Sequence, residues 1–292
     1  MKSKVYFTKD LSTAGLMRVF EALGADLSGK VAVKVHSGEK GNQNFLRPEY
    51  FRDIINKVNG TVVECNTAYA GQRNTTEKHQ QLIKEHGWTE YFDVDIMDAE
   101  GDMEIPVNKG SILSVDVVGS HLSNYDSMLV LSHFKGHPMG GFGVALKQLS
   151  IGCASSAGKT LIHTAGKAND QSKLWDNVAK QDDFLDCMAE TAGAVVDFFG
   201  RKMAFVNVMC NMSVDCDCCA KAEDPCLCDV GILASLDPVA IDKACIDIVY
   251  NSDDEGKAHF IERVESRNGL RTIQTAESLG VGSTDYELIN ID

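Results

Sequence analysis

The fold is decided by residues 31–65, VAVKVHSGEKGNQNFLRPEYFRDIINKVNGTVVEC. The stretch begins with an apolar run, Val31–Val35, which is typical of a strand buried on both faces. A proline and a glycine then bracket a helical segment, Glu49–Val58, because proline favours the first helical turn and glycine the position after the last. A second apolar run, Thr61–Cys65, follows. This order predicts two parallel strands joined by a crossover helix.

The same alternation continues on both sides of this unit. Further strands are predicted at Val5–Thr8, Ser127–His133, Met203–Val208, Gly231–Ser235 and Tyr286–Ile291. Further helices are predicted at Ser12–Leu23, Thr75–His86, Phe142–Ile151, Asp182–Phe199 and Thr272–Leu279, and after Pro238. Residues 91–118 are rich in valine, isoleucine and turn signals and predict strands and hairpins. The chain is therefore expected to be an α/β protein, with a mostly parallel or mixed sheet covered by helices on both faces.

Composition limits the domain organisation and the partners. We expect residues 1–292 to form a single domain, and the alternative is a division near residue 100 into two α/β lobes, 1–100 and 101–292. A net charge of −14 argues against nucleic acid and anionic membranes, so an anionic ligand would need a local basic site. The N-terminal residues lack the apolar core of a signal peptide, and no apolar run reaches membrane-spanning length. These features predict a cytoplasmic protein.

Six of the ten cysteines lie between Cys210 and Cys228. In a reducing compartment such a cluster indicates metal ligation or redox chemistry rather than a disulfide framework. Two Cys-x-Cys pairs provide the predicted metal ligands, which are Cys216, Cys218, Cys226 and Cys228. Thiolates hold both iron–sulfur clusters and zinc, and we expect an iron–sulfur cluster, with zinc as the alternative. The alternative without a chemical function is a structural zinc ion, or a group of reduced thiols, in a surface loop.

A second unusual segment runs from His133 to His163 and is rich in histidine, lysine and glycine. It follows a predicted strand end, where open α/β sheets bind their ligands. His133 and His137 are candidates for general base and acid, because imidazole titrates near neutral pH. Lys135 and Lys147 could hold a carboxylate or a phosphate, or form a covalent adduct. For a single histidine a structural role is the more common one, but this grouping favours a catalytic site.

Two polar loops follow the strands of residues 31–65. The first contains His36, Asn42 and Arg47 as candidate ligand-binding residues, and the second contains Arg73, which could reach an anion at a helix start. A polar crossover loop without function explains the same composition. The sequence therefore predicts a small anionic ligand at this edge of the sheet, with no nucleic-acid or membrane partner.

These stretches carry a family resemblance. The motifs Val33-Lys-Val-His36-x-Gly-Glu-x-Gly-Asn42, Tyr69-x-Gly-x-Arg73-Asn-Thr, His133-Phe-Lys-Gly-His137 and Cys216-Asp-Cys218, followed by Asp229–Asp242, resemble the family called domain of unknown function 362. The resemblance runs nearly end to end. Many members carry a ferredoxin-like Cys-x-x-Cys-x-x-Cys insert after the position of His163. This chain has Ala168–Asp183 there, without cysteine, so the resemblance does not imply the insert's electron-carrier activity.

A more distant resemblance concerns mechanism. The order His137, Gly-Gly, Lys147, His163 is similar to that of the nickel-pincer lactate racemases. By this similarity His137 would be an acid/base residue, Lys147 the lysine that holds the pincer cofactor, and His163 a nickel ligand, with His36 as the other histidine. The cysteine cluster is foreign to those racemases, so nickel ranks behind iron–sulfur and zinc.

The sequence as a whole predicts a metal-binding protein of uncharacterised function. We expect an iron–sulfur-dependent redox or acid/base enzyme of anaerobic metabolism that acts on a small anionic metabolite. The alternatives are a nickel-pincer racemase or epimerase-like enzyme, and a non-catalytic electron-transfer or zinc-stabilised binding protein. A redox protein partner and a homo-oligomer are compatible with each of them.

Overall fold

The computed structural model describes residues 2–292. Its strands are β1 (Ser3–Thr8), β2 (Val31–Lys34), β3 (Thr61–Glu64), β4 (Val94–Ile96), β5 (Asp102–Pro106), β6 (Val115–Gly119), β7 (Ser127–His133), β8 (Lys135–His137), β9 (Gly141–Gly143), β10 (Met203–Met209), β11 (Gly231–Ser235) and β12 (Tyr286–Asn290). Its α-helices are α1 (Thr13–Leu23), α2 (Arg52–Lys57), α3 (Thr76–Glu85), α4 (Ala145–Cys153), α5 (Ser156–His163), α6 (Gln181–Phe199), α7 (Pro238–Asn251), α8 (Lys257–Ser266) and α9 (Arg271–Ser278).

One eight-stranded sheet forms the centre of the molecule, with the order β12-β1-β11-β10-β7-β2-β3-β4. Within residues 2–292, β11 is the one strand of this sheet that is antiparallel to its neighbours. The other strands are parallel to one another, so the predicted mostly parallel sheet is confirmed. Strands from both sides of residue 100 belong to it, since β1 lies between β12 and β11, and β2 pairs with β7.

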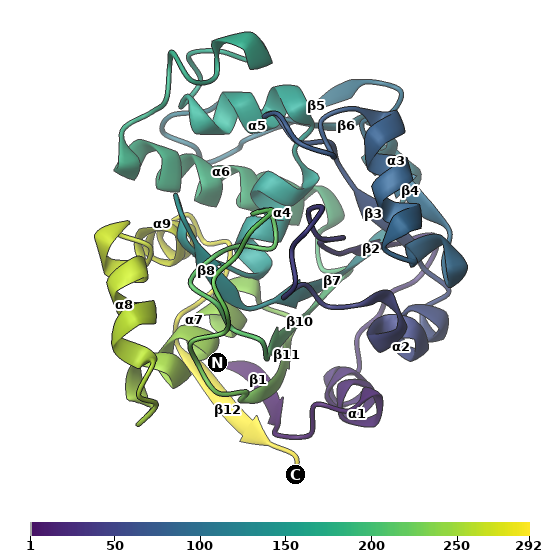
Figure 1. Cartoon of the computed structure of the whole chain (residues 1–292), viewed down its shortest axis with the longest axis vertical. Coiled ribbons are helices and arrows are strands. Elements are labelled where there is room, and N and C mark those ends of the chain that lie inside the picture. Colours follow the sequence, from purple (N-terminus) through teal and green to yellow (C-terminus); the bar gives the residue numbers. More distant parts are fainter. Residues whose placement is uncertain (1) are drawn as a thin grey trace.

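Helices cover both faces of the sheet, as expected (Figure 1). Alternate residues of β7 point to opposite faces, so Met128 and Val130 join one apolar cluster while Leu129 and Leu131 join the other. The first cluster packs beneath α4, α6, α7 and α9, and the second beneath α1, α2 and the residues around Trp88. This two-sided burial explains why the strands are apolar throughout rather than alternating.

The strands and hairpins predicted for residues 91–118 are confirmed, because residues 94–96 form β4 and residues 102–119 form the hairpin β5–β6. Other segments differ from the predicted elements, and residues 135–143 form the hairpin β8–β9. The helix expected from Phe142 begins at Ala145, because Phe142 belongs to β9 and the carboxylate of Asp242 accepts the N–H groups of Ala145 and Leu146. Helices α5 and α8 were not predicted. No helix within residues 2–292 combines the length and apolar character needed to cross a membrane.

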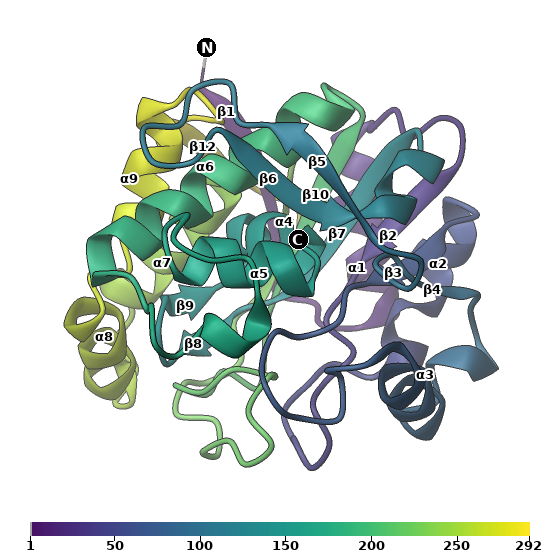
Figure 2. The same ribbon diagram turned by 90° about the horizontal axis from the view of Figure 1, so that it is seen from above.

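Four neighbouring parallel strands, β10, β7, β2 and β3, end at the same edge of the sheet. The loops that follow them contain residues 35–47, 65–75, 134–144 and 210–230. Figure 2 shows these loops projecting together on one side of the molecule. Because loops beyond the carboxyl ends of parallel strands are the usual ligand-binding region of α/β sheets, this edge is the place to look for a site.

Candidate metal and anion site

The loop after β2 holds the cysteine-rich segment in place. Asn42 Nδ2 donates to the carbonyl oxygens of Cys216 and Cys219, at 3.3 and 2.9 Å, and Asn44 Nδ2 donates to the carbonyl of Glu223 at 2.8 Å. Asn42 Oδ1 accepts the N–H groups of Asn44 and Phe45, which fixes its own side chain. Asn42 therefore holds the cysteine-rich backbone in position through contacts with its carbonyl groups.

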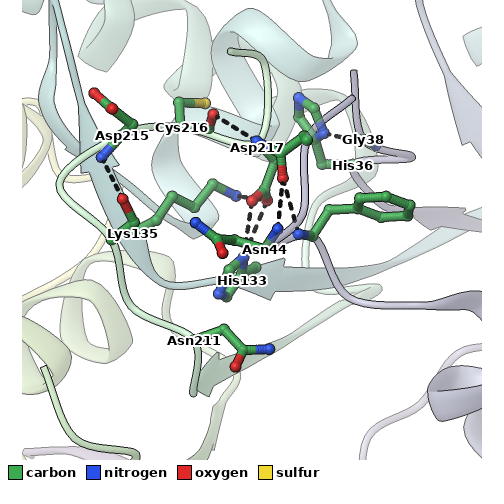
Figure 3. Close-up of polar contacts among 12 residues, drawn as sticks. His36, Gly38, Asn44, His133, Lys135, Asn211, Asp215, Cys216 and Asp217 are labelled. Atoms are coloured by element: carbon green, nitrogen blue, oxygen red, sulfur yellow. Dashed lines mark hydrogen bonds and ion pairs between the residues drawn. The ribbon is translucent and has the colours of Figure 1, made fainter. Parts of the chain in front are cut away.

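Asp217, between the first two paired cysteines, is buried against two cationic side chains (Figure 3). Its carboxylate lies 2.9 Å from Lys135 Nζ, and 3.0 and 3.1 Å from His133 Nδ1. Burial would raise the pKa of Asp217, but His133 and Lys135 outweigh it and hold the pKa well below its usual value. Asp217 is therefore an anion in the interior.

His133 has acceptors on both sides of its ring. Nδ1 faces the Asp217 carboxylate and Nε2 lies 2.6 Å from the carbonyl oxygen of Cys210. Both ring nitrogens thus contact acceptor oxygens, and His133 ties β7 to the cysteine-rich segment.

Glycine allows that segment to approach β8 closely. A Cβ atom on Gly136 would lie 2.0 Å from the carbonyl oxygen of Val214, and the Gly136 N–H donates to the carbonyl of Ser213 at 2.8 Å. The neighbouring Lys135 and His137 are both buried. Lys135 and His137 therefore lie on either side of Gly136, where the backbone contact with the cysteine-rich segment leaves no room for a side chain.

His137, Cys216 and Cys218 could hold a metal ion, because their ligand atoms all lie within 4.8 Å of one another. His137 Nδ1 accepts the N–H groups of Met139 and Gly140, at 3.2 and 2.8 Å, which fixes the ring. Nε2 is then the nitrogen that carries the proton, and a metal bound there would displace it. Burial holds the pKa of His137 well below its usual value, so the ring is neutral near pH 7.

Lys147, the predicted third catalytic residue, lies beside these thiols. It projects from the first turns of α4, and its Nζ is 3.8 Å from Cys216 Sγ. Burial opposes the charge on Lys147, but the neighbouring Cys216 and Cys218 outweigh it and raise its pKa. Burial raises the pKa of the Cys216 thiol well above its usual value, and the Lys147 ammonium acts against this effect.

The second predicted cysteine pair does not join this group. Within residues 2–292, no other group of three or more His, Cys, Asp or Glu side chains has its ligand atoms within 4.8 Å of one another. Cys226 packs against the backbone of Met212, and Cys228 is exposed. The four-cysteine ligand set thus remains a prediction, and the geometry favours His137 as the third ligand.

The loops after β2 and β3 contribute a buried charge network. Lys34 Nζ lies 2.6 Å from Glu64 and 3.1 Å from Gln148 Oε1, and Arg73 Nε lies 3.2 Å from Glu39. Arg73 Nη2 and Gln148 Nε2 are buried and have no hydrogen-bond partner in the described part of the chain. Arg73 and Gln148 line a small pocket whose lining also includes Lys147, Lys159, Tyr69 and Cys218.

The remaining predicted residues lie at different distances from this pocket. His36 lines it, and its Nε2 is 3.4 Å from Arg73 Nη1. Arg47 is exposed and lies over the ring of Phe45 at 3.8 Å, outside the group of buried charges. His163 donates from Nδ1 to the carbonyl of Lys159 at 2.7 Å, and burial lowers its pKa to about 4. The structure thus brings His36 and Arg73 together and places Arg47 at the surface.

Several charged residues of the site were missed from the sequence. Lys34 and Glu64 occupy the last positions of apolar strands, and Asp217 stands between two cysteines. A charged residue inside a run that is otherwise apolar is rarely buried without a partner, and this signal could have identified the first two. Gln148 and Lys159 had no such signal, because each lies on an ordinary amphipathic helix.

Fold and site together define an α/β protein with a buried thiol–imidazole group that could hold a metal ion, next to a cationic pocket. The chain belongs to the family described as domain of unknown function (DUF362), whose profile matches residues 31–247. The family recognised from the sequence motifs is therefore confirmed. None of the curated proteins compared with the chain matches it.

Two solved structures are similar to the chain. The lactate racemase apoprotein from Thermoanaerobacterium thermosaccharolyticum has 11% sequence identity and a TM-score of 0.46, over 85% of this chain and 57% of that protein. A structural-genomics crystal structure of a protein from Thermotoga maritima has 12% identity and a TM-score of 0.46, over 80% of this chain and 57% of that protein. The chain thus spans less than two thirds of either protein, and an activity is not inferred from such similarity.

Proposed function

We propose that this protein is a metal-dependent enzyme that acts on a small anionic metabolite by redox or acid/base chemistry. The observation that carries the proposal is the juxtaposition of two features: a Cys-Cys-His group that could hold a metal, and a pocket that contains Cys218 together with several cations. A metal held at the wall of a cationic pocket would lie within reach of an anionic substrate.

The donor set fits a thiophilic metal. Two cysteine sulfurs and one imidazole nitrogen suit zinc, iron and iron–sulfur clusters, and do not suit calcium or magnesium. We propose an iron–sulfur cluster, since Cys219 directly follows Cys218 and adds a further thiol next to the pair. Zinc is the second candidate, because two cysteines and one histidine with an open fourth position are also the ligand set of a known type of catalytic zinc site.

Roles for the surrounding residues follow from their contacts. Lys147 lines the pocket and lies next to Cys216, so it is placed to bind the substrate and to stabilise the thiolates. His137 completes the metal ligands, whereas His133 and Lys135 act through Asp217 to hold the cysteine loop. His36 and Arg73 form the opposite side of the pocket.

We also propose that residues 1–292 form a single cytoplasmic domain. The single domain is supported by the one sheet in which β1 lies between β12 and β11, so that strands from before and after residue 100 are interleaved. The same interleaving argues against two independent lobes, since a lobe ending near residue 100 would lack the β7 partner of β2.

The test is purification under anaerobic conditions, followed by metal and sulfide analysis and an optical spectrum. Iron with inorganic sulfide and broad visible absorbance is the expected result. One zinc per chain without colour would instead support the zinc enzyme. The variant His137→Ala should lose most of the bound metal. A wild-type protein without stoichiometric metal after reconstitution with iron and sulfide, or with zinc, would refute the proposal.

A further inference from the structure

The pocket beside Cys218 has features that the metal centre does not explain. It holds a volume of about 40 Å³ and lies between the loop that contains Arg73 and the helices α4 and α5. Gln148 and Lys159, which project from these helices, were not among the residues expected to bind a ligand. A volume of this size admits a group of a few heavy atoms.

Two buried donors in the pocket wall lack acceptors. Arg73 is 3% exposed and Gln148 is 6% exposed, yet Arg73 Nη2 and Gln148 Nε2 have no partner within residues 2–292. An unpaired buried donor costs free energy, and a guanidinium nitrogen more than a neutral amide. Both side chains are fixed by their other ends, because Arg73 Nε contacts Glu39 and Gln148 Oε1 accepts from Lys34. Both residues line the pocket, and their unpaired nitrogens are held in place before any ligand arrives.

The charges of the lining favour an anion. Lys34, Arg73, Lys147 and Lys159 line the pocket together with one carboxylate, that of Glu64. The protein as a whole has a net charge of −14. Lys34 is paired with Glu64 at 2.6 Å and Arg73 with Glu39 at 3.2 Å, which leaves Lys147 and Lys159 without a carboxylate partner within residues 2–292. Such a local excess of positive charge attracts a small anion and would be partly neutralised by it.

We propose that this pocket binds the carboxylate group of a small substrate between Arg73 Nη2 and Gln148 Nε2, beside Cys218. The inference rests on the proposed function, since it places the substrate's carboxylate against a wall of the metal centre. A carboxylate presents two acceptor oxygens in one plane, one for each of the two unpaired nitrogen donors.

The carboxylate site can be separated from the metal centre by a binding measurement on the protein as isolated. Acetate and inorganic phosphate are titrated by calorimetry into wild-type protein whose metal content has been determined. The variant Gln148→Glu keeps an acceptor for Lys34 but replaces the free donor with a negative oxygen. It should weaken acetate binding by about tenfold or more. Gln81→Glu, on an exposed face of α3, adds the same charge and should leave acetate binding unchanged.

A second variant covers the case in which Gln148→Glu does not fold, which thermal unfolding will show. Arg73→Lys keeps a cation beside Glu39 and removes Nη2, so it should also weaken acetate binding by about tenfold. The carboxylate site is refuted if acetate does not bind, if phosphate binds more tightly, or if the folded variants bind acetate as well as wild type does. Acetate binding to a protein that takes up no metal would leave the pocket standing and refute the metal-dependent enzyme.

Discussion

The two Cys-x-Cys pairs have the same spacing and lie in opposite surroundings. Cys216 is fully buried, with Lys147 3.8 Å from its sulfur, and the residue between the pair is the buried Asp217. Cys228 is exposed, and its N–H donates to the carboxylate of Asp254 at 2.7 Å. Neighbouring acidic groups raise the pKa of Cys228, and Asp254 has the largest effect. At the first pair burial raises the pKa of Cys216 well above its usual value and the cations Lys147 and Lys135 oppose that effect, whereas at Cys228 no cation of the described residues opposes the carboxylates.

This difference shows that cysteine spacing indicates ligand chemistry but not which cysteines become ligands. The first pair is drawn to the sheet edge because Asp217 meets the cations of β7 and β8 there. The second pair follows Pro225 and leads away toward the turn between α7 and α8, where Asp254 lies. Tertiary contacts of the residues between the cysteines thus separate two pairs that look equivalent in the sequence.

The largest effect should come from removing the thiols. The double variant Cys216→Ser, Cys218→Ser should lose essentially all bound metal, because two of the three proposed ligands disappear. The matched variant Cys226→Ser, Cys228→Ser should keep it, since those sulfurs lie outside the buried group. Metal content per chain after anaerobic purification measures both. Equal loss in the two variants would restore the four-cysteine ligand set and remove the contrast between the pairs.

The next effect concerns the ion pairs beside each pair of cysteines. Asp217→Asn removes the buried anion that balances His133 and Lys135, and leaving buried charges uncompensated costs about 3–5 kcal/mol of unfolding free energy. Glu223→Gln breaks the exposed pair with His259, whose side chains are half exposed, and should cost several-fold less. Denaturant unfolding of both variants gives the comparison. Similar losses would mean that burial does not distinguish the two surroundings.

Much of the fold could be predicted because the pattern of apolar runs and helix signals is local. The strand from Ser127 to His133 and the helix to Phe199 were found with nearly correct ends, and so was the sheet edge at which His36, Arg73 and His133 lie. The reversed direction of β11 could not be predicted, since a buried strand reads the same in either direction.

The site was predicted only in part, for a related reason. Histidine and cysteine attract attention by their chemistry, whereas their partners do not, so Asp217, Glu64 and Gln148 were overlooked. The contacts of His133 are with the Cys210 carbonyl and the Asp217 carboxylate, which are distant in sequence. Roles set by such long-range contacts become visible only once the loops of four strands are assembled at one edge.

The smallest expected effect is a difference in acid sensitivity. The pKa of Asp217 in the folded protein is well below its unfolded value of about 3.9, so its ionised form contributes stability that is complete above that value. This stability is lost as the pH falls below about 4, at up to about 1.4 kcal/mol per pH unit. Asp217→Asn lacks the contribution, so its stability should fall less steeply with acid than that of wild type.

Asp254 supplies the matched control near the second pair. Its hydrogen bond from the Cys228 N–H also lowers its pKa, but it lies near the surface, where solvent screens the interaction. Asp254→Asn should therefore leave the acid profile close to that of wild type. Urea midpoints measured between about pH 3 and pH 6 test both variants. If Asp254→Asn flattened the profile as much as Asp217→Asn does, an exposed carboxylate would contribute as much as the buried one. The buried charges at the first cysteine pair would then not be the main source of the protein's acid sensitivity.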